Sequence, residues 1–185
     1  MIDKRIAAML LVVSGMAVGL TVGALAGPVL FDEPKMPDDA MSLAGIEKLA
    51  VEVKPFPGSL VELGITADLI RDRWIKRLKE ADFEIVEGRD QPRLWLEMRV
   101  GGDPDLGEAY AFIARIRFIQ PVRIDRLDRT LSVPTYVTGA YGMLPPDRLR
   151  SEITRTLDER INTFISKVRD ATQYVEGEGA EAEAQ

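Results

Sequence analysis

Apolar and polar side chains alternate in five segments between residues 48 and 142, which is the period expected of β-strands with one buried face. In chain order these segments are KLAVEVKP (48–55), FEIVE (83–87), RLWLEMRV (93–100), AYAFIARIRFIQPV (109–122) and TLSVPTYVTGAYG (130–142). In the last segment, the alternation puts on the buried side Leu131, Val133, Val137 and Tyr141. The pattern therefore predicts a sheet of five strands.

Two other segments repeat apolar residues at helical spacing. In residues 66–83, Thr66 is placed to cap a helix, and the apolar face consists of Ile70, Trp74, Leu78 and Ala81. A second helix begins at Pro146, a residue type favoured in the first turn, and is predicted to end near Ala171. Its continuous apolar stripe consists of Leu149, Ile153, Leu157, Ile161, Phe164 and Val168.

The order strand, helix, four strands, helix predicts an α+β fold. Two amphipathic helices need a surface to cover, so we expect a two-layer sandwich with both helices on one face of a mainly antiparallel sheet. This domain is predicted to span residues 43–172. A linker rich in proline and acidic residues precedes it at 27–42, and an acidic tail at 173–185 has the composition of a disordered segment.

Residues 1–26 are predicted to be a membrane anchor or a signal segment. Residues 6–26 carry no charge, and as a helix they would span about 31 Å, near the hydrocarbon thickness of a bilayer. Lys4 and Arg5 place the N-terminus in the cytoplasm, so the sequence predicts a single-pass inner-membrane protein with its C-terminal domain in the periplasm. The alternative is a signal peptide cleaved after Ala26, which would leave a soluble periplasmic protein.

Four glycines recur at intervals of four in this segment: Gly15, Gly19, Gly23 and Gly27. On a helix they form one stripe without side chains, where another helix can approach closely. We expect the stripe to pack against a second copy or another membrane protein, and the alternative is that glycine is simply common in signal sequences. Pro28 follows in the sequence LAGP, where a lipoprotein signal would have its lipidated cysteine, so lipidation at this position is excluded.

Composition narrows the possible chemistry. The chain has no cysteine and no histidine, which excludes thiolate metal sites, cysteine nucleophiles and Ser-His-Asp catalysis. The loop GGDPDLGE (101–108) departs from the calcium-loop pattern, and we predict no cofactor and no metal. Residues 42–175 contain 21 basic and 21 acidic side chains, so the net charge of −6 arises in the flanks and predicts no nucleic-acid surface.

The solvent side of the predicted sheet has the residue types of a binding face. It combines aromatic and arginine side chains, which are common anchors of interfaces, namely Trp95, Tyr136, Arg93, Arg99, Arg115 and Arg117. Arginine can also stack on Trp95. The alternative is an ordinary solvated face with cross-strand pairs, since Glu97 and Lys54 lie on the same side. A hydrolase would have to use carboxylates, of which Glu97 and Asp103 are candidates.

The run SLAGIEKLAVEVKPF (42–56), followed by a helix that ends in LKEADFEIVE (78–87), resembles a recurrent pattern in small bacterial envelope proteins. The pattern positions in the run are Leu43, Gly45, Ile46, Leu49, Val51 and Val53. Over residues 43–171, the strand-helix-strands-helix order is similar to that of the lipopolysaccharide-assembly lipoprotein family. This resemblance implies a non-enzymatic periplasmic role in envelope assembly or transport. That family is anchored through a lipidated cysteine where this chain has Pro28, and no functional residue of the family carries over.

The expected function is that of a membrane-anchored, non-catalytic binding or scaffold subunit in the periplasm. Two alternatives are a cleaved, soluble periplasmic protein that binds a lipid or small ligand, and a carboxylate-based hydrolase. The first residue of the mature protein separates the anchored form from the cleaved form, because cleavage after Ala26 would make Gly27 the N-terminus.

The glycine stripe makes a direct prediction. Replacing Gly19 with leucine fills the middle of the stripe, so it should weaken association of the membrane helix and leave the periplasmic domain folded. The oligomer distribution of the full chain in detergent measures this effect. Equal oligomerisation of the wild type and Gly19→Leu would contradict the packing role of the stripe.

Overall fold

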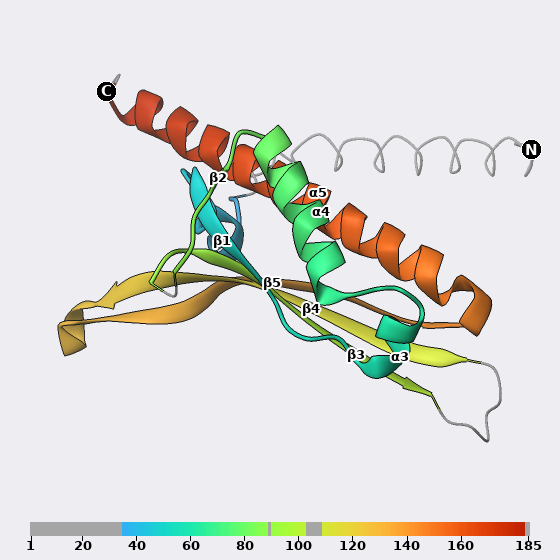
Figure 1. The fold of residues 1–185 in the computed structure, drawn as a ribbon. Helices are drawn as coiled ribbons and strands as arrows, with labels where there is room; N and C mark the ends of the chain where they lie inside the picture. The colour runs from blue at the N-terminus through green and yellow to red at the C-terminus, as the bar shows by residue number, and fades with distance from the viewer. Residues whose placement is uncertain (1–34, 89, 103–108, 184–185) are drawn as a thin grey trace, which may run out of the picture. The chain divides into compact units, whose positions relative to one another are not determined.

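The alternating segments of the sequence form one five-stranded sheet in the computed structural model, which describes residues 35–88, 90–102 and 109–183. With its helices the sheet makes a mixed α+β domain, as predicted (Figure 1). The elements are, in chain order, α2 (Asp38–Met41), β1 (Lys48–Val53), α3 (Gly58–Glu62), α4 (Ala67–Glu80), β2 (Glu84–Ile85), β3 (Arg93–Gly102), β4 (Tyr110–Ile124), the short 3₁₀ helix η3 (Asp125–Leu127), β5 (Arg129–Leu144) and α5 (Pro146–Glu183).

The strands lie in the order β2-β1-β3-β4-β5. The pairings β3–β4 and β4–β5 are antiparallel and extend over most of the sheet, whereas β1 is parallel to both of its neighbours over short stretches. The sheet is therefore mainly antiparallel by extent, as predicted. Parallel strands need a crossover connection, and α4 provides it for β1 and β2. The helix returns the chain to the end of the sheet at which β1 begins, so β2 runs in the same direction as β1.

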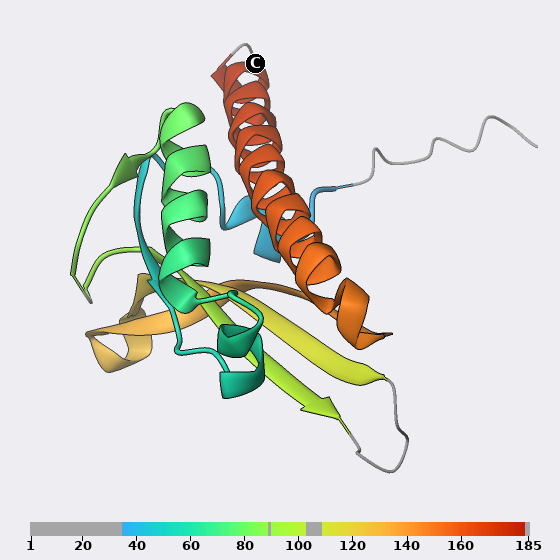
Figure 2. The same ribbon diagram turned by 45° about the vertical axis from the view of Figure 1, so that its right-hand side comes forward.

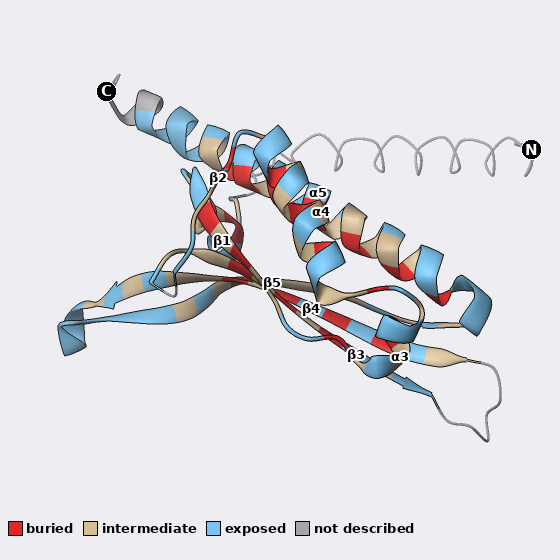
Figure 3. Ribbon diagram, viewed as in Figure 1, coloured by how far each residue is buried: buried red, intermediate tan, exposed pale blue. Residues whose placement is uncertain are grey.

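Helices α4 and α5 lie side by side over one face of the sheet in both views (Figures 1 and 2). The buried residues of both helices, red in Figure 3, form bands on the side of each helix that faces the sheet. The buried residues of α4 are Ile70, Trp74 and Leu78, and Thr66 caps the helix by accepting a hydrogen bond from the Leu69 amide at 3.1 Å. Every residue of the predicted α5 stripe is buried: Leu149, Ile153, Leu157, Ile161, Phe164 and Val168.

Ion pairs join the two helices beside their apolar contact. Asp158 of α5 accepts hydrogen bonds from Arg73 and lies 3.2 Å from the guanidinium of Arg77. Arg77 also donates to the side-chain oxygen of Asn162 at 3.2 Å. Since Asp158 is mostly buried, these contacts are less screened by water than pairs on an open surface, and they help to fix the position of α4 along α5.

The centre of the core is an aromatic group that connects α5 to the antiparallel strands. The ring of Phe164 lies 5.6 Å from that of Phe118 on β4 and 6.4 Å from that of Tyr136 on β5, measured between ring centroids. Both pairs are tilted, which is a favourable arrangement of aromatic quadrupoles. Phe118 and Tyr136 are also opposite each other in the strand register. Phe164 therefore fixes which face of β4 and β5 is buried.

The face of β5 that is buried differs from the prediction. Tyr136, predicted on the solvent side, is only 4% exposed, whereas Val137 and Tyr141, predicted to be buried, are 55% and 87% exposed. The cause is a β-bulge: Phe118 pairs with Tyr136 but Ile119 pairs with Pro134, so Thr135 is an extra residue. One extra residue reverses the alternation, and every side chain of β5 after the bulge changes face.

Two boundaries of the domain also differ from the prediction. The last part of the expected 27–42 linker forms α2, in which Ala40 is buried, and Asp38 and Asp39 lie in the first turn, where the helix dipole favours acidic residues. At the other end, the segment expected to be disordered after residue 172 continues α5 as a helix. There the hydroxyl of Tyr174 donates to the Glu178 carboxylate at 2.7 Å, one turn later.

No helix in the described part of the chain is long and apolar enough to cross a membrane. The predicted anchor at 6–26 and the glycine stripe (Gly15, Gly19, Gly23 and Gly27) lie outside the described residues.

Gly139 in β5 provides a test of how tightly β4 and β5 pack. A Cβ atom there would lie 2.5 Å from the carbonyl oxygen of Ala114, a backbone atom that cannot move aside on its own. Gly139→Ala should therefore lower the free energy of unfolding by about 1–3 kcal/mol. Thermal unfolding followed by circular dichroism measures the loss.

Gly101 in β3 is the matched control, because a Cβ atom added there meets no heavy atom within 4 Å. Gly101→Ala should leave the stability unchanged or raise it slightly, since alanine restricts the unfolded chain. Equal stability of the two variants would contradict the close approach of β5 to β4.

Candidate functional site

The face of β3, β4 and β5 opposite α4 and α5 has no described helix over it (Figures 1 and 2). We call this surface the outer face. It receives the alternate side chains of each strand, namely Arg93, Trp95, Glu97 and Arg99 of β3, Ile113, Arg115 and Arg117 of β4, and Val137, Gly139, Tyr141 and Met143 of β5. The structure thus brings together five of the six predicted binding residues and excludes Tyr136.

Trp95 lies at the centre of a row of side chains across the outer face. Its strand neighbours are Glu52 on β1 and Arg117 on β4. The guanidinium carbon of Arg117 is 4.9 Å from the centroid of the indole, and the ammonium of Lys54 is 5.9 Å from it. Each contact is a cation–π interaction, worth about 0.5–1 kcal/mol at an exposed site. The two cations hold the half-buried ring in one orientation before any partner binds.

Glu97 organises the neighbouring row. Its carboxylate accepts hydrogen bonds from two nitrogens of Arg99, at 2.9 and 3.1 Å, and lies 4.0 Å from Arg115. The hydrogen bond from Arg99 lowers the pKa of Glu97 below its ordinary value, the positive charges of Arg99, Arg115 and Arg117 lower it further, and partial burial opposes them. Glu97 is therefore ionised at neutral pH, where it is a poor proton donor.

Cations outnumber carboxylates on this part of the sheet. The five cations are Arg93, Arg99, Arg115, Arg117 and Lys54, and the two carboxylates are Glu52 and Glu97. Glu52 pairs with Lys54 at 2.7 Å and with Arg93 at 3.5 Å. Some of these charges are paired within a strand and some across strands, as in an ordinary solvated face, whereas the positive excess that remains is typical of a binding face.

The β4–β5 side of the outer face is apolar. Four large side chains there are between 47% and 87% exposed: Ile113, Val137, Tyr141 and Met143. Three of them belong to β5, whose alternation in the sequence predicts Val137 and Tyr141 on the buried side and does not indicate the bulge at Thr135. Grouped exposed apolar side chains beside arginine and tryptophan are typical of protein-binding surfaces.

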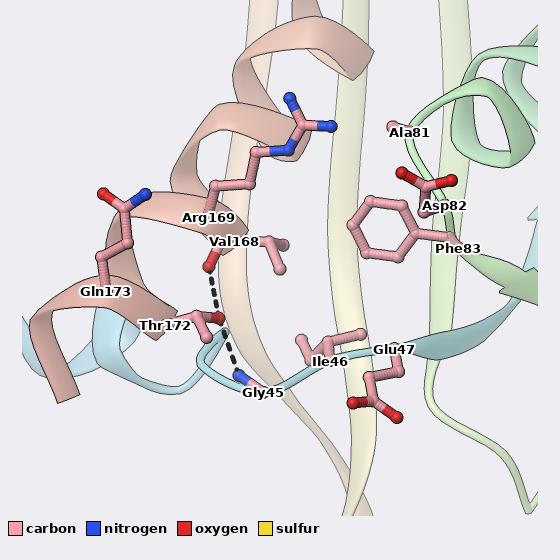
Figure 4. A pocket seen from close by; sticks show the side chains of 10 residues that line it. All are labelled: Gly45, Ile46, Glu47, Ala81, Asp82, Phe83, Val168, Arg169, Thr172 and Gln173. Carbon is pink, nitrogen blue, oxygen red and sulfur yellow. Dashed lines mark hydrogen bonds between the residues drawn. The ribbon is translucent and has the colours of Figure 1, made fainter. Parts of the chain in front are cut away.

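A pocket of about 280 Å³ lies on the helical side of the domain (Figure 4). Three segments distant in sequence line it, at residues 45–47, 81–83 and 168–173. The side chains of Ile46, Phe83 and Val168 face one another across it, and its edge is polar. This volume is below the range of about 300–1,000 Å³ that is usual for small-molecule sites. The outer face is therefore the stronger candidate for a binding site.

The other candidates from the sequence have separate outcomes. Asp103, the second carboxylate considered for a hydrolase, lies outside the described residues together with most of the loop 101–108. The segment TGAYGML (138–144) is a regular part of β5. Among the residues that the structure describes, no group of three or more acidic side chains is placed to hold a metal ion.

The ion pairs of Glu97 give a titration test. Arg99→Gln removes the hydrogen bond that lowers the pKa of Glu97 most, so this pKa should rise towards its ordinary value of 4.5. A carbon-13 NMR titration of the Glu97 side chain measures it. A carboxyl whose pKa is lower in the folded state stabilises that state at pH values above its unfolded pKa, and this contribution is lost when acid protonates the group. Arg99→Gln should therefore lose less stability than the wild type as the pH falls below about 4.5.

Arg126→Gln is the control for this titration. Arg126 is also exposed, but it lies in η3 at the far end of the β4–β5 hairpin. Its replacement should leave the pKa of Glu97 unchanged. A pKa that does not respond to Arg99→Gln would contradict the pairing of Glu97 with Arg99.

No protein-family model matches this chain, and a search of curated proteins finds no match. Three solved structures of bacterial lipoproteins are similar to it at low identity. A minor lipoprotein from Acinetobacter baumannii has 12% identity and a TM-score of 0.29, and the match covers 72% of this chain and 94% of the other. The rare lipoprotein B from Shewanella oneidensis has 15% identity and a TM-score of 0.25, with coverages of 74% and 97%. An uncharacterised lipoprotein B from Nitrosomonas europaea has 13% identity and a TM-score of 0.27, with coverages of 78% and 88%. Similarities of this size establish neither a family nor a shared function.

Proposed function

We propose that this protein is a non-catalytic binding or scaffold subunit of a bacterial envelope complex. In this proposal, residues 6–26 anchor the chain in the inner membrane, and the α+β domain binds a protein partner in the periplasm through the outer face. The observation that carries the proposal is the position of Trp95, held between Arg117 and Lys54 on a sheet face without a helix over it.

A preorganised tryptophan is a suitable binding anchor. Ordering a side chain on binding costs about 0.5–1.5 kcal/mol, and the cations on either side of Trp95 have already restricted its ring. Tryptophan and arginine are also the residue types in which binding energy concentrates. A partner that covers Trp95 and extends about four residues along the strands, or roughly 13 Å, would also reach Ile113 and Arg99, which lie opposite each other two rows from Trp95.

The positive excess indicates the charge of the partner. The carboxylates of Glu52 and Glu97 are already paired, whereas Arg99 and Arg115 keep 68% and 44% of their side chains exposed. A partner with acidic side chains around an apolar centre would complement both parts of the surface. The ionised state of Glu97 supports a structural role for this carboxylate rather than that of a catalytic acid.

The anchor is supported by the sequence alone. Lys4 and Arg5 precede an uncharged stretch long enough for one transmembrane helix, which gives the orientation proposed here. Tethering the domain to the membrane would confine its search to partners near the same surface and raise their effective concentration. A moderate affinity at the outer face would then be sufficient for stable assembly.

Site-specific photo-crosslinking in intact cells tests the proposal. A photoreactive amino acid at Ile113, which is 47% exposed on the outer face, should form an adduct with a distinct envelope protein. Adding Trp95→Ala should reduce the adduct at least several-fold, because truncation of a binding anchor costs about 2 kcal/mol or more. Adducts are identified by mass spectrometry after purification from membranes.

Leu69 is the matched control position. It is 42% exposed and apolar like Ile113, but it lies on α4, on the opposite side of the domain. The photoreactive group there should give no such adduct. The same adduct from both positions, or an adduct from Ile113 that is indifferent to Trp95→Ala, would contradict binding through the outer face.

A further inference from the structure

The two edges of the sheet differ in how they are protected against pairing with another strand. One edge is β2, which has only two residues, one of them the exposed Glu84. Natural sheets commonly keep edge strands short, charged or interrupted by proline, because the unpaired N–H and C=O groups of an edge accept any extended chain. The other edge is β5, with 16 residues, and most of it lacks these features.

The unprotected part of β5 is the segment 136–144, YVTGAYGML, which contains no charge and no proline. We call it the open edge. In an antiparallel pair, alternate residues direct their N–H and C=O groups away from the paired strand. Within the described part of the chain, no group outside β4 forms a hydrogen bond with these residues. The hydroxyl of Ser42 reaches the edge only at the carbonyl of Thr135, in the bulge, at 3.4 Å.

We propose that the open edge pairs with the open edge of a second copy of this chain, in an antiparallel arrangement centred on Ala140. Pro145 and the bulge at Thr135 select this register. Pairing Ala140 with Ala140 of the second copy aligns residues 136–144 with 144–136 and leaves Pro134 and Pro145 outside the paired segment. With nine paired residues, a centre at residue 141 brings Pro145 into the paired segment, where it has no N–H to donate. A centre at residue 139 brings in Thr135 of the bulge, where the regular ladder of β5 is interrupted.

The side chains of the open edge complement one another in this register. On the outer face, Val137 lies opposite Met143 of the second copy, so two exposed apolar side chains cover each other. Tyr141 lies opposite Gly139 of the second copy, where the absence of a side chain leaves room for the aromatic ring. A side chain at position 139 would collide with the carbonyl oxygen of Ala114, so this position requires glycine. The same requirement leaves the space beside it free for Tyr141 of the second copy.

Charge complementarity also favours a second copy as the occupant. In a two-fold pair, any charge on the edge of one copy would lie near the same charge on the other copy. The open edge has no charged side chain, so pairing neither brings like charges together nor removes a charge from water. Arg117 of each copy would be separated by three strand spacings across the sheet, about 14 Å, and by six residues along it, about 20 Å. Each of these distances exceeds the Debye length of about 8 Å at physiological ionic strength. The paired copies would share a continuous ten-stranded sheet with their outer faces side by side.

Disulfide trapping tests the register, because the chain has no cysteine of its own. Val137→Cys and Met143→Cys are separate variants of the full chain, carrying different tags, and both positions are exposed. Directly opposite residues have Cα atoms about 4.5–5.5 Å apart, within the range that a disulfide spans. Mixing the variants in detergent under mild oxidation should give a disulfide between them in high yield.

Each variant alone is the control. Two Val137 positions would be six residues apart along the paired strands, or about 20 Å, which no disulfide can bridge. The mixed disulfide should therefore exceed either homodisulfide at least tenfold. Equal yields in all three samples, or no mixed disulfide, would overturn the proposal, including the case in which β5 pairs with a different protein.

A second measurement uses the cysteine-free chain with Gly19→Leu, so that association through the membrane helix does not mask that of the sheet. Tyr141→Lys places a charge on the open edge at a position that is 87% exposed, so it should reduce the dimer fraction at least tenfold without unfolding the domain. Ile113→Lys places the same charge on the same face but on β4, and should leave the dimer intact. Sedimentation in detergent measures both. An unchanged dimer fraction with Tyr141→Lys, or an equal loss with Ile113→Lys, would overturn pairing through the edge.

Discussion

The contact of Phe164 with Phe118 and Tyr136 determines how the rest of the domain is arranged. It joins α5 to two strands at once, and it does so beside the bulge, where the alternation of β5 reverses. Once these rings are buried on the helical side, Val137, Tyr141 and Met143 have to lie on the outer face. The aromatic contact in the core and the apolar surface on the opposite side are therefore two results of the same register.

The sequence predicts those features that depend on neighbours along the chain. The stripe of α5, the Thr66 cap and the alternation of β3 and β4 are local patterns, and the structure confirms each of them. The parallel pairing of β1 and the pocket near Phe83 depend on segments far apart in sequence, for which no local pattern exists. The bulge is intermediate. Pro134 inside a strand pattern is a known sign of a bulge or an edge strand, but it does not decide between them, so the face on which Tyr136 lies depends on tertiary packing.

Five of the six residues predicted for the binding face lie on it, since β3 and β4 alternate without interruption there. The sequence does not predict which of these charged side chains contact one another or Trp95. The pKa of Glu97 is lowered chiefly by Arg99 on the same strand and further by arginines of β4. Trp95 is ordered because Arg117 of β4 and Lys54 beside β1 approach it. The contacts between strands depend on cross-strand register, which is set by tertiary packing and by turn geometry.

The two tryptophans occupy opposite environments, and this gives the protein two internal optical reporters. Trp74 is fully buried between α4 and the sheet, in surroundings that favour emission at short wavelength, whereas Trp95 is in contact with solvent and with two cations. Loss of core packing would change the emission of Trp74, and covering the outer face would change that of Trp95. The fluorescence of this domain therefore responds both to loss of core packing and to covering of the outer face, without any added label.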